Sequence, residues 1–262
     1  MTSIVMLRQM ADFKGSLAKD LLRTIPIRRG TWQSEATSLK TYEMGNVIVQ
    51  SSVPLREDWI QDKCEPDLPW APTHFEERVS GIPHNPPPSY LAWPWHSARE
   101  ADHHLQQGVF DHTYPERFWP KFAGAPGGQG GDLVSNPHGG IRFKYGDLNA
   151  VVTQLKADSW TRQAYLPVWF PEDTGATEGQ RVPCTLGYHF IRNGPEMDIN
   201  YFLRSCDLTR HFHNDVYFAM RLLVWVLNQC GFQKDFEVPR PGNLTMFISN
   251  MHLFEADKWR YQ

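Results

Sequence analysis

The chain has 262 residues, of which 41% are hydrophobic, so it can bury a sizeable core, and intrinsic disorder is excluded as its main state. Its 29 acidic and 26 basic side chains give a formal charge of −3 without a basic tail, which argues against a nucleic acid polymer as partner. The sequence has no apolar run near the roughly 20 residues of a bilayer span and no signal-peptide pattern. We therefore expect a soluble protein of the cytoplasm, or of the host cytoplasm if it is viral, with no membrane partner.

The cysteines and histidines form no recognisable disulfide or metal pattern. The four cysteines are widely separated, which favours free thiols: Cys64, Cys184, Cys206 and Cys230. The 11 histidines include His103-His104 and His211-x-His213, which leaves a metal enzyme as an alternative, but the sequence contains no HExxH motif. We expect no metal cofactor.

The first part of the chain predicts one helix, one strand and a long irregular segment. Apolar spacing favours a helix around Ser16–Leu22, followed by a basic turn over residues 23–30. The run Val47–Val49 predicts a buried strand. Residues 66–95 are rich in proline and tryptophan, and because proline lacks an N–H we expect no regular helix or central strand there.

Loop, helix and strand signals follow in the middle of the chain. The segment Gly127–Gly131 matches neither a P-loop nor a dinucleotide-binding turn and predicts a mobile loop. Asp147 is placed to cap a helix whose apolar residues recur through Leu155. Residues 164–170 predict an edge strand, because they contain Pro167.

The remainder of the chain gives the clearest fold signals. Leu186–Ile191 and Met197–Leu203 predict a hairpin joined by an Asn-Gly turn. Val216–Cys230 predicts a core helix, and a further strand is expected at Leu244–Ser249. The order of elements indicates an α+β layered fold, and since neither a repeat nor a composition shift marks a boundary, we expect a single domain over residues 1–262.

A cysteine and an Arg-Ser-x-Asp motif suggest where chemistry takes place. Cys184 precedes a predicted strand, and Arg204-Ser205-Cys206-Asp207 follows the hairpin. An arginine near a thiol favours the thiolate, which is the nucleophilic form, and its planar fork suits a phosphate group. Cys184 is therefore a candidate nucleophile beside a phosphate-binding arginine.

These motifs resemble, in order and spacing, the catalytic half of the thymidylate synthase family. The resemblance covers residues 146–254 and rests on Asp147-Leu148 through Lys156, Arg162, Trp169, Pro183-Cys184, Arg204-Ser205-Cys206-Asp207, the helix after it and His252. It implies a mixed sheet packed with helices and a homodimer formed sheet to sheet. It also implies a pyrimidine nucleoside monophosphate as substrate and 5,10-methylenetetrahydrofolate as co-substrate.

The resemblance assigns a phosphate site with arginines from two subunits. Arg204 would hold the phosphate from the same subunit, and Arg162 would reach it from the partner subunit, because two arginines match a dianion in charge and geometry. Gln163 stands where the family commonly has a second arginine, so we expect Arg28 or Arg29 to supplement this site.

The same resemblance places residues around the base and the sugar. Asp207 would order the base and its waters, and Ser205 belongs to the same binding segment. His252 would contact the sugar. Phe254 stands where the family usually has a tyrosine, which removes one hydroxyl from the sugar pocket and leaves both CMP and dCMP open as substrates.

Asp215 is the position that indicates which base is read. Thymidylate synthases have an asparagine there, whose amide matches uracil O4 and N3, whereas a carboxyl group can accept from the cytosine amino group and share a proton with N3. The row Phe212-His213-Asn214-Asp215 resembles the Phe-x-Asn-Asp of cytidylate hydroxymethylases, which also share a threonine after the catalytic cysteine, as in Thr185. If the register shifts by one to Asn214, the residue that recognises the base carries an amide, and the expected substrate is uridylate.

The resemblance makes Cys184 the nucleophile that adds to pyrimidine C6, so that C5 becomes able to attack the folate methylene. Hydride on the resulting C5 methylene gives methyl, and water gives hydroxymethyl. Methyl-forming members have a long C-terminal segment over the folate, whereas this sequence ends ten residues after His252, which favours hydroxymethylation. Trp93, Trp95 and Trp119 are candidate stacking surfaces for the folate ring.

Proton transfer needs further groups. Glu76 and Glu77 lie where the family has a catalytic glutamate, and the sequence does not choose between them. Tyr114 corresponds to a tyrosine that assists removal of the C5 proton.

Two alternatives remain within the same resemblance. The first is reductive C5 methylation of dCMP or dUMP, as in thymidylate synthases. The second is a non-catalytic nucleotide-binding homologue, against which the presence of Cys184 with Arg204 and Asp207 argues.

Overall fold

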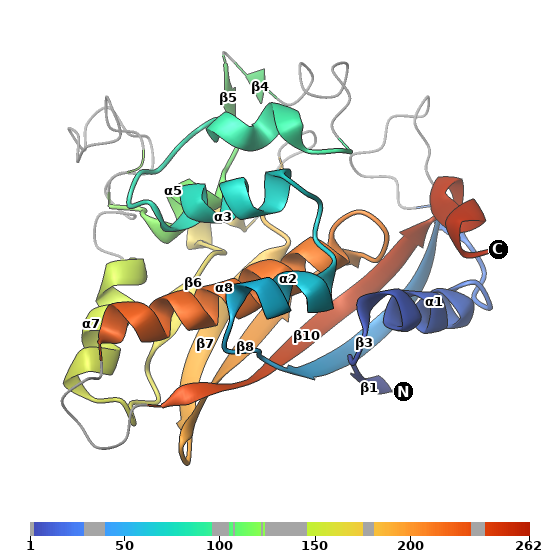
Figure 1. Ribbon diagram of the computed structural model, residues 1–262. Coiled ribbons are helices and arrows are strands. Elements are labelled where there is room, and N and C mark those ends of the chain that lie inside the picture. The colour runs from blue at the N-terminus through green and yellow to red at the C-terminus, as the bar shows by residue number, and fades with distance from the viewer. Residues whose placement is uncertain are drawn as a thin grey trace. The chain divides into compact units, whose positions relative to one another are not determined.

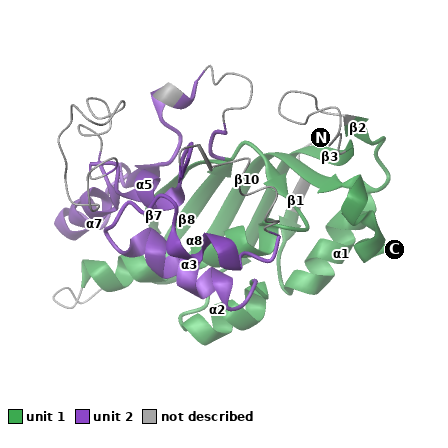
Figure 2. Cartoon of the chain, turned by 90° about the horizontal axis from the view of Figure 1, so that it is seen from above, with its two compact units in different colours: residues 1–66, 177–179, 184–262 green, residues 67–176, 180–183 purple. Residues whose placement is uncertain are grey.

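The computed structural model describes residues 3–28, 40–95, 105–106, 108–121, 123, 146–174, 181–231 and 239–262. The chain divides into two compact units (Figure 2), of which unit 1 holds residues 1–66, 177–179 and 184–262 and unit 2 holds residues 67–176 and 180–183. The single domain over residues 1–262 that the sequence suggests remains a prediction. No helix in the described ranges is long and apolar enough to cross a bilayer.

Unit 1 is a mixed sheet with helices. Its elements are β1 (Ser3–Met6), α1 (Met10–Leu21), β2 (Ile27–Arg28), β3 (Lys40–Ser52), α2 (Glu57–Cys64), β7 (Thr185–Asn193), β8 (Glu196–Leu203), β9 (Cys206–Asp207), α8 (Phe212–Cys230), β10 (Arg240–Phe254) and a final 3-10 helix, Glu255–Tyr261. The strand order is β1-β3-β10-β8-β7, with β2 paired to β3 and β9 to β10. The sheet is mixed because β10 runs antiparallel to β3 but parallel to β8. β10 lies between these two strands although it follows both in the chain.

α8 is the core helix of unit 1 and packs on one face of the sheet (Figure 1), where it contacts β8, β10 and α2. Most of its 19 residues are buried, and it ends at Gly231, which has a left-handed φ of 56°. Residues along β10 and β8 alternate between buried and half-buried, as expected when one sheet face is covered.

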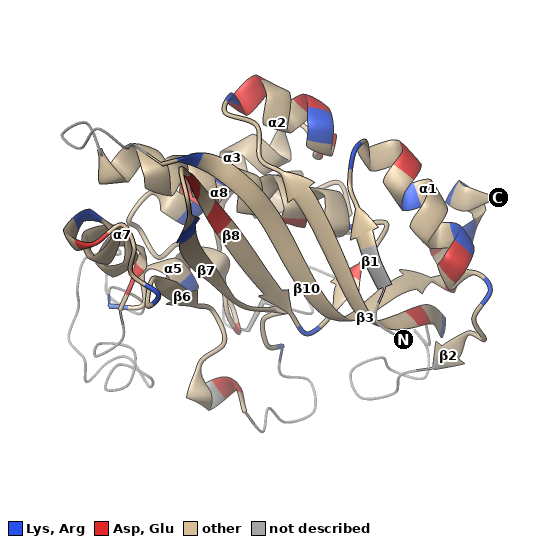
Figure 3. Ribbon diagram, turned by 90° about the horizontal axis from the view of Figure 1, so that it is seen from below, with Lys and Arg blue, Asp and Glu red and all other residues tan. Residues whose placement is uncertain are grey.

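The second face of this sheet is mostly uncharged, and no described helix of unit 1 lies over β3, β10 and β8 in Figure 3. Phe247 pairs with Ile48 on β3 and with Phe202 on β8. The rings of Phe202 and Phe247 stack with centroids 5.0 Å apart. We call this surface the open sheet face.

Unit 2 contains short helices and strands: α3 (Trp70–Val79), a 3-10 helix at Pro88–Ala92, β4 (Leu105–Gln106), β5 (Val109–Phe110), α5 (Tyr114–Phe118), α7 (Leu148–Ala157), β6 (Tyr165–Pro167) and a 3-10 turn at Pro171–Asp173. β4 and β5 form an antiparallel pair. α7 begins where predicted, since Asp147 accepts a hydrogen bond from Ala150 N.

The sequence predictions agree with several elements and are wrong for others. The hairpin and the core helix are confirmed as β7, β8 and α8. The first helix begins earlier than predicted, at Met10, and the strands predicted at residues 47–49 and 244–249 are the middles of longer ones, β3 and β10. The glycine-rich segment 127–131 lies outside the described residues.

The prediction that residues 66–95 contain no regular helix is wrong. α3 occupies Trp70–Val79 within this segment. Pro72 is its third residue, and a proline in the first helical turn removes no intrahelical hydrogen bond, because those N–H groups have no partner within the helix. Pro69 precedes the helix as its N-cap residue.

A buried ion pair organises one part of unit 2. Arg117 and Asp173 are 2% and 4% exposed, and their two hydrogen bonds measure 2.7 and 2.8 Å. Asp173 also accepts from Phe170 N at 2.8 Å. A buried charge is tolerated when a partner and further hydrogen bonds satisfy it, so this pair fixes α5 against the 3-10 turn.

We expect Asp173→Asn to lower the free energy of unfolding by about 3–5 kcal/mol, because it leaves the Arg117 charge buried without a counterion. Urea denaturation followed by circular dichroism measures this change. The matched control is Asp58→Asn, which breaks the exposed pair with Arg56 and should change stability little. Equal effects of the two substitutions would contradict the structural role of the buried pair.

Candidate active site

Cys184 lies at the residue before β7, and its carbonyl oxygen accepts a hydrogen bond of 2.9 Å from Arg204 N. Both residues are exposed. The other three cysteines are buried. The end of β8 thus brings the backbone of the proposed phosphate-binding arginine next to that of the proposed nucleophile.

The short strand β9 places Ser205, Asp207 and His252 together. Cys206 and Asp207 pair with Met251 and His252 near the end of β10. Ser205 Oγ lies 3.2 Å from His252 Nδ1. Burial lowers the pKa of His252 to about 4, and the charge of Arg204 adds to this effect, so its ring is neutral at pH 7 and can exchange hydrogen bonds with a hydroxyl group.

Asp207 is 4% exposed, and its two oxygens differ. Oδ1 accepts from the backbone N–H groups of Thr209 and Arg210 at 2.8 and 3.1 Å. Oδ2 has no hydrogen-bond partner among the described residues, with Arg210 Nε 3.9 Å away. Burial raises the pKa of Asp207 although these hydrogen bonds oppose the shift. A buried oxygen with acceptor capacity to spare suits a ligand or a water molecule.

The first turn of α8 places the side chains of Asn214 and Asp215 in different surroundings. Asn214 is 2% exposed, and its Nδ2 donates to Arg210 O at 3.5 Å. Asp215 is half-buried, and its Oδ2 lies 3.6 Å from the sulfur of Cys206. The helix therefore ties the amide to its own N-terminal turn and directs the carboxyl group to β9.

Four groups form what we call the Cys206 cluster: Cys184, Cys206, Asp207 and Asp215. Burial, then the charges of Asp215, Asp207 and Cys184, raise the pKa of the Cys206 thiol well above its usual range. The proposed base reader thus contacts one buried, protonated thiol, on which the charges of the proposed base-ordering carboxyl group and the proposed nucleophile also act.

In unit 2, the structure distinguishes the two candidate glutamates. Glu76 is exposed, whereas Glu77 is 8% exposed and accepts from Ser89 N at 2.7 Å and from Ser89 Oγ at 2.6 Å. His74 Nδ1 lies 3.1 Å from Glu77 Oε2, and Trp70 stacks on the His74 ring. Glu77 is therefore held in one orientation by a hydrogen-bond network.

Electrostatics keep this network ionised at Glu77 and neutral at His74. Burial acts to raise the pKa of Glu77, but the hydrogen bonds from His74 and Ser89 outweigh it, and the pKa lies below its usual value. Burial lowers the pKa of His74 to about 4. In this arrangement Glu77 can accept a proton at neutral pH but does not start as an acid.

The other candidates of unit 2 differ in exposure. Tyr114 is half-buried at the start of α5, and the Arg78 guanidinium lies 4.1 Å from its ring centroid. Trp119 is 2% exposed, and its Nε1 donates to Arg78 O, which leaves little ring surface for a ligand. Trp93 and Trp95 are half-buried.

Of the remaining phosphate-site candidates, only Arg162 has a side chain among the described ones. Arg162 is exposed in the segment after α7. Arg28 ends β2, but its side chain is not among the described ones, and Arg29 lies outside the described residues.

Sequence reasoning missed a contact that fixes the chain just before Cys184. Asp111 Oδ2 accepts from Arg181 N at 2.9 Å, and His112 Nδ1 lies 3.1 Å from Arg181 O. Burial lowers the pKa of His112 to about 3, so the neutral ring donates its Nδ1–H to this carbonyl group. No local signal could have revealed this contact, because the partners are about seventy positions apart.

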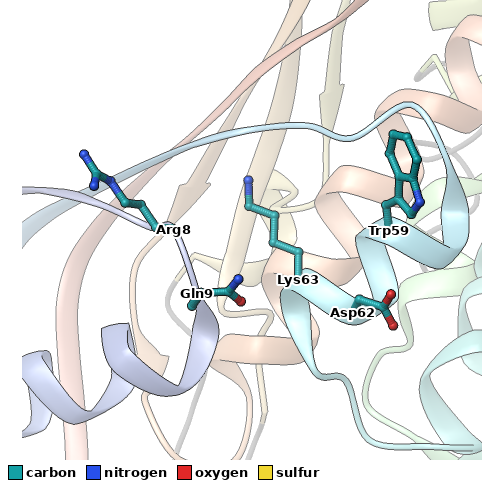
Figure 4. Close-up of a pocket in the computed structure, with 5 residues that line it drawn as sticks. All are labelled: Arg8, Gln9, Trp59, Asp62 and Lys63. Carbon is teal, nitrogen blue, oxygen red and sulfur yellow. The ribbon is translucent and has the colours of Figure 1, made fainter.

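A pocket of about 260 Å³ in unit 1 is lined by Arg8, Gln9, Trp59, Asp62 and Lys63 (Figure 4). Lys63 Nζ donates to Ser52 O, and Ser52 pairs with Asn243 near the beginning of β10. The Cys206 cluster lies near the other end of β10, where Asp207 pairs with His252. The pocket is therefore separate from the cluster.

No group of three or more histidine, cysteine or carboxylate side chains within the described ranges could hold a metal ion.

The family model described as thymidylate synthase matches residues 102–258, more than half of the chain. The chain belongs to the thymidylate synthase family. A thymidylate synthase of Sphingopyxis alaskensis (strain DSM 13593 / LMG 18877 / RB2256) is 23% identical over 249 residues, which cover 92% of this chain and 71% of that protein.

A solved structure, the thermostable thymidylate synthase A from Bacillus subtilis, has a similar fold. It matches with a TM-score of 0.61 at 14% identity, covering 95% of this chain and 81% of that chain. The predicted α+β fold of the thymidylate synthase type, with a mixed sheet packed against helices, is confirmed.

We expect alkylation of the folded protein by iodoacetamide to modify Cys184 first. It is exposed, whereas Cys64, Cys206 and Cys230 are buried and react only after local opening. Peptide mass mapping after a short reaction measures this selectivity. The variant Cys184→Ser should take up no label on the same timescale, and prompt labelling of a buried cysteine would contradict the structure.

Proposed function

We propose that the protein transfers one carbon from methylenetetrahydrofolate to C5 of a cytidine monophosphate, CMP or dCMP, and hydrates it to a hydroxymethyl group. One observation carries the proposal: the Asp215 carboxyl group contacts Cys206, in the segment whose Arg204 N–H bonds to the Cys184 carbonyl group, while the neighbouring amide of Asn214 is tied to Arg210 O. Membership of the thymidylate synthase family supports the reaction class.

Cys184 is the nucleophile in this proposal. Its sulfur adds to pyrimidine C6, which places electron density on C5 and lets C5 bond to the one-carbon unit that the folate supplies. Loss of the C5 proton and departure of the folate leave an exocyclic methylene on the nucleotide. A water oxygen adds to this methylene, and elimination of the Cys184 sulfur restores the ring.

Asp215 reads the base. Cytosine presents an amino donor at N4 and an acceptor at N3, so a carboxyl group with one shared proton satisfies both, whereas uracil O4 would face a second acceptor. The Oδ2 atom of Asp207, buried and with acceptor capacity to spare, orders the base or its waters.

The phosphate and sugar sites combine charged and neutral groups. Arg204 binds the phosphate from the subunit that holds Cys184, and Arg162 reaches it from the partner subunit, with Arg28 or Arg29 as supplements. Ser205 and the neutral His252 ring, 3.2 Å apart, offer hydrogen bonds to the sugar.

Proton transfer is assigned to unit 2. Glu77, held as a carboxylate by Ser89 and His74, is favoured over the exposed Glu76 as the group that accepts a proton. Tyr114 assists removal of the C5 proton. Trp93 and Trp95 retain ring surface on which a folate could stack, and Trp119 retains little.

The product assignment rests on residues that match the cytidylate hydroxymethylases: Asp215 within Phe-x-Asn-Asp and Thr185 after the nucleophile. Thr185 is fully buried, and its Oγ1 lies 2.8 Å from Tyr201 OH. The second candidate is reductive methylation of dCMP or dUMP, which the same covalent adduct permits.

The deciding experiment incubates the protein with methylenetetrahydrofolate and CMP, dCMP or dUMP and weighs the product. We expect a cytidylate heavier by about 30 mass units, whereas methylation would add about 14. Cys184→Ser should abolish tritium release from C5-labelled substrate, which a non-catalytic binder would never show. Turnover of dUMP alone would remove the cytosine assignment.

A paired substitution tests the base reader. Asp215→Asn should lower the ratio of kcat/KM for cytidylate over uridylate by about a hundredfold, because an amide oriented to donate to uracil O4 and accept from N3–H presents a donor to the cytosine amino group. Asn214→Asp is the matched control and should leave this ratio near that of the wild type. A reversed pattern would move the reader to position 214.

We propose further that the open sheet face forms a homodimer. Members of the family are usually dimers, and this face presents the stacked, half-buried Phe202 and Phe247 with no described helix of unit 1 over it. Burial of such a face against its copy removes apolar area from water, and a partner would also supply Arg162.

We expect sedimentation equilibrium to give twice the chain mass for the wild type and a single chain mass for Phe247→Glu, because the new charge would be buried in the interface. Trp259→Glu, at a residue 65% exposed, is the control and should remain dimeric. Mixing inactive Cys184→Ala and Arg162→Ala proteins should restore activity, since each mixed dimer has one complete site. A monomeric wild type would refute the dimer.

A further inference from the structure

Cys206 contacts the proposed base reader directly. Its side chain is 2% exposed, and its sulfur lies 3.6 Å from Asp215 Oδ2 and 3.9 Å from Asp207 O. The carboxyl oxygen is the nearer of these two acceptors and, when ionised, the stronger one. Asp207 stabilises the turn between Cys206 and Asp215, because its Oδ1 accepts hydrogen bonds from Thr209 N and Arg210 N. The contact therefore joins two positions whose backbones are fixed.

The thiol stays a donor across the neutral pH range. The titratable groups that act on it are Asp207 beside it on β9, Asp215 on α8 and Cys184 before β7. All three add negative charge when ionised, and the site is buried, so a thiolate at Cys206 is disfavoured. Cys206 is for this reason poorly suited to be a nucleophile and well suited to be a permanent S–H donor.

A carboxyl group needs such a donor to read cytosine. Its two oxygens are chemically equal, and the torsion that exchanges them is broad. Cytosine requires one oxygen that accepts from the amino group and one that shares a proton with N3. A donor on Oδ2 lowers the basicity of that atom and leaves the proton to Oδ1, and a carboxyl oxygen has a second lone pair with which it can accept from an amino group.

We propose that Cys206 is a positioning residue for base specificity: its S–H holds the Asp215 carboxyl group so that Oδ2 accepts from the cytosine amino group and Oδ1 carries the proton shared with N3. The inference rests on the proposed cytidylate function. It assigns Cys206 no contact with the reacting carbon.

The test is a competition between cytidylate and uridylate in one tube, with methylenetetrahydrofolate in excess and both products weighed. Cys206→Ala should lower the cytosine-over-uracil ratio of kcat/KM about three- to fivefold, which is the contribution of a weak S–H bond. Cys206→Ser keeps a donor and should stay within about twofold of the wild type.

The matched control is Cys64→Ala, which also removes a buried thiol from unit 1. The Cys64 sulfur is fully buried and lies 3.7 Å from the Met220 sulfur, with no carboxyl group in that contact. Its loss should leave the ratio unchanged, even if stability falls. A change of equal size in this control would assign the effect to general destabilisation and overturn the inference.

A spectroscopic reading does not depend on turnover. In the infrared spectrum of the wild type, the S–H stretch of Cys206, identified by its loss in Cys206→Ala or Cys206→Ser, should lie at lower frequency than that of Cys64, because only Cys206 donates to a carboxyl group. Asp215→Asn should move this band to higher frequency, and a band that does not move would overturn the proposed contact.

The outcomes separate this inference from the function on which it rests. If the wild type turns over no cytidylate, both the proposed function and the positioning role of Cys206 are refuted. A wild type that prefers cytidylate, combined with an unchanged ratio in Cys206→Ala, removes the positioning role and leaves the function intact. If Cys206→Ala does not fold, the infrared comparison of wild type with Asp215→Asn decides.

Discussion

The parallel pairing of β9 with the end of β10 is the constraint on which the site of unit 1 depends. It joins Cys206 and Asp207 to Met251 and His252, and it sets the turn from which α8 begins. Because Asp207 closes that turn with its own carboxylate, the first residues of α8 start at a defined position. Asp215 reaches the Cys206 sulfur only because both ends of this short segment are fixed.

Local chemistry was enough to predict a large part of the fold. Asp147 caps α7, Gly231 ends α8 in a left-handed conformation, and the Asn-Gly turn joins β7 to β8. Each of these features depends on a few consecutive residues, and the residue types alone determine their dihedral preferences and local hydrogen bonds. The alternation of buried residues in β8 and β10 follows for the same reason.

Features that depend on distant partners could not be predicted in this way. The sequence offered Glu76 and Glu77 as equals, and the folded chain distinguishes them by burying Glu77 and by bringing Ser89 to its carboxylate. The missed helix α3 has a local cause instead: the rule that proline breaks helices does not apply to the first turn, where a proline costs the helix no hydrogen bond. The motif identified Cys184. The hydrogen bonds that Asp111 and His112 make to the backbone of Arg181, three residues earlier, form only in the folded chain.

The place of β10 in the sheet has a consequence for how the protein folds. β3 and β8 cannot acquire their shared neighbour until β10, the last strand in chain order, has been synthesised. Until then each of these two strands presents an unpaired edge, which is a site for misassociation between chains. The pairing of strands far apart in sequence, such as β3 with β10, also predicts slow folding. Misassociation of these strand edges during synthesis is therefore the expected weakness of this fold.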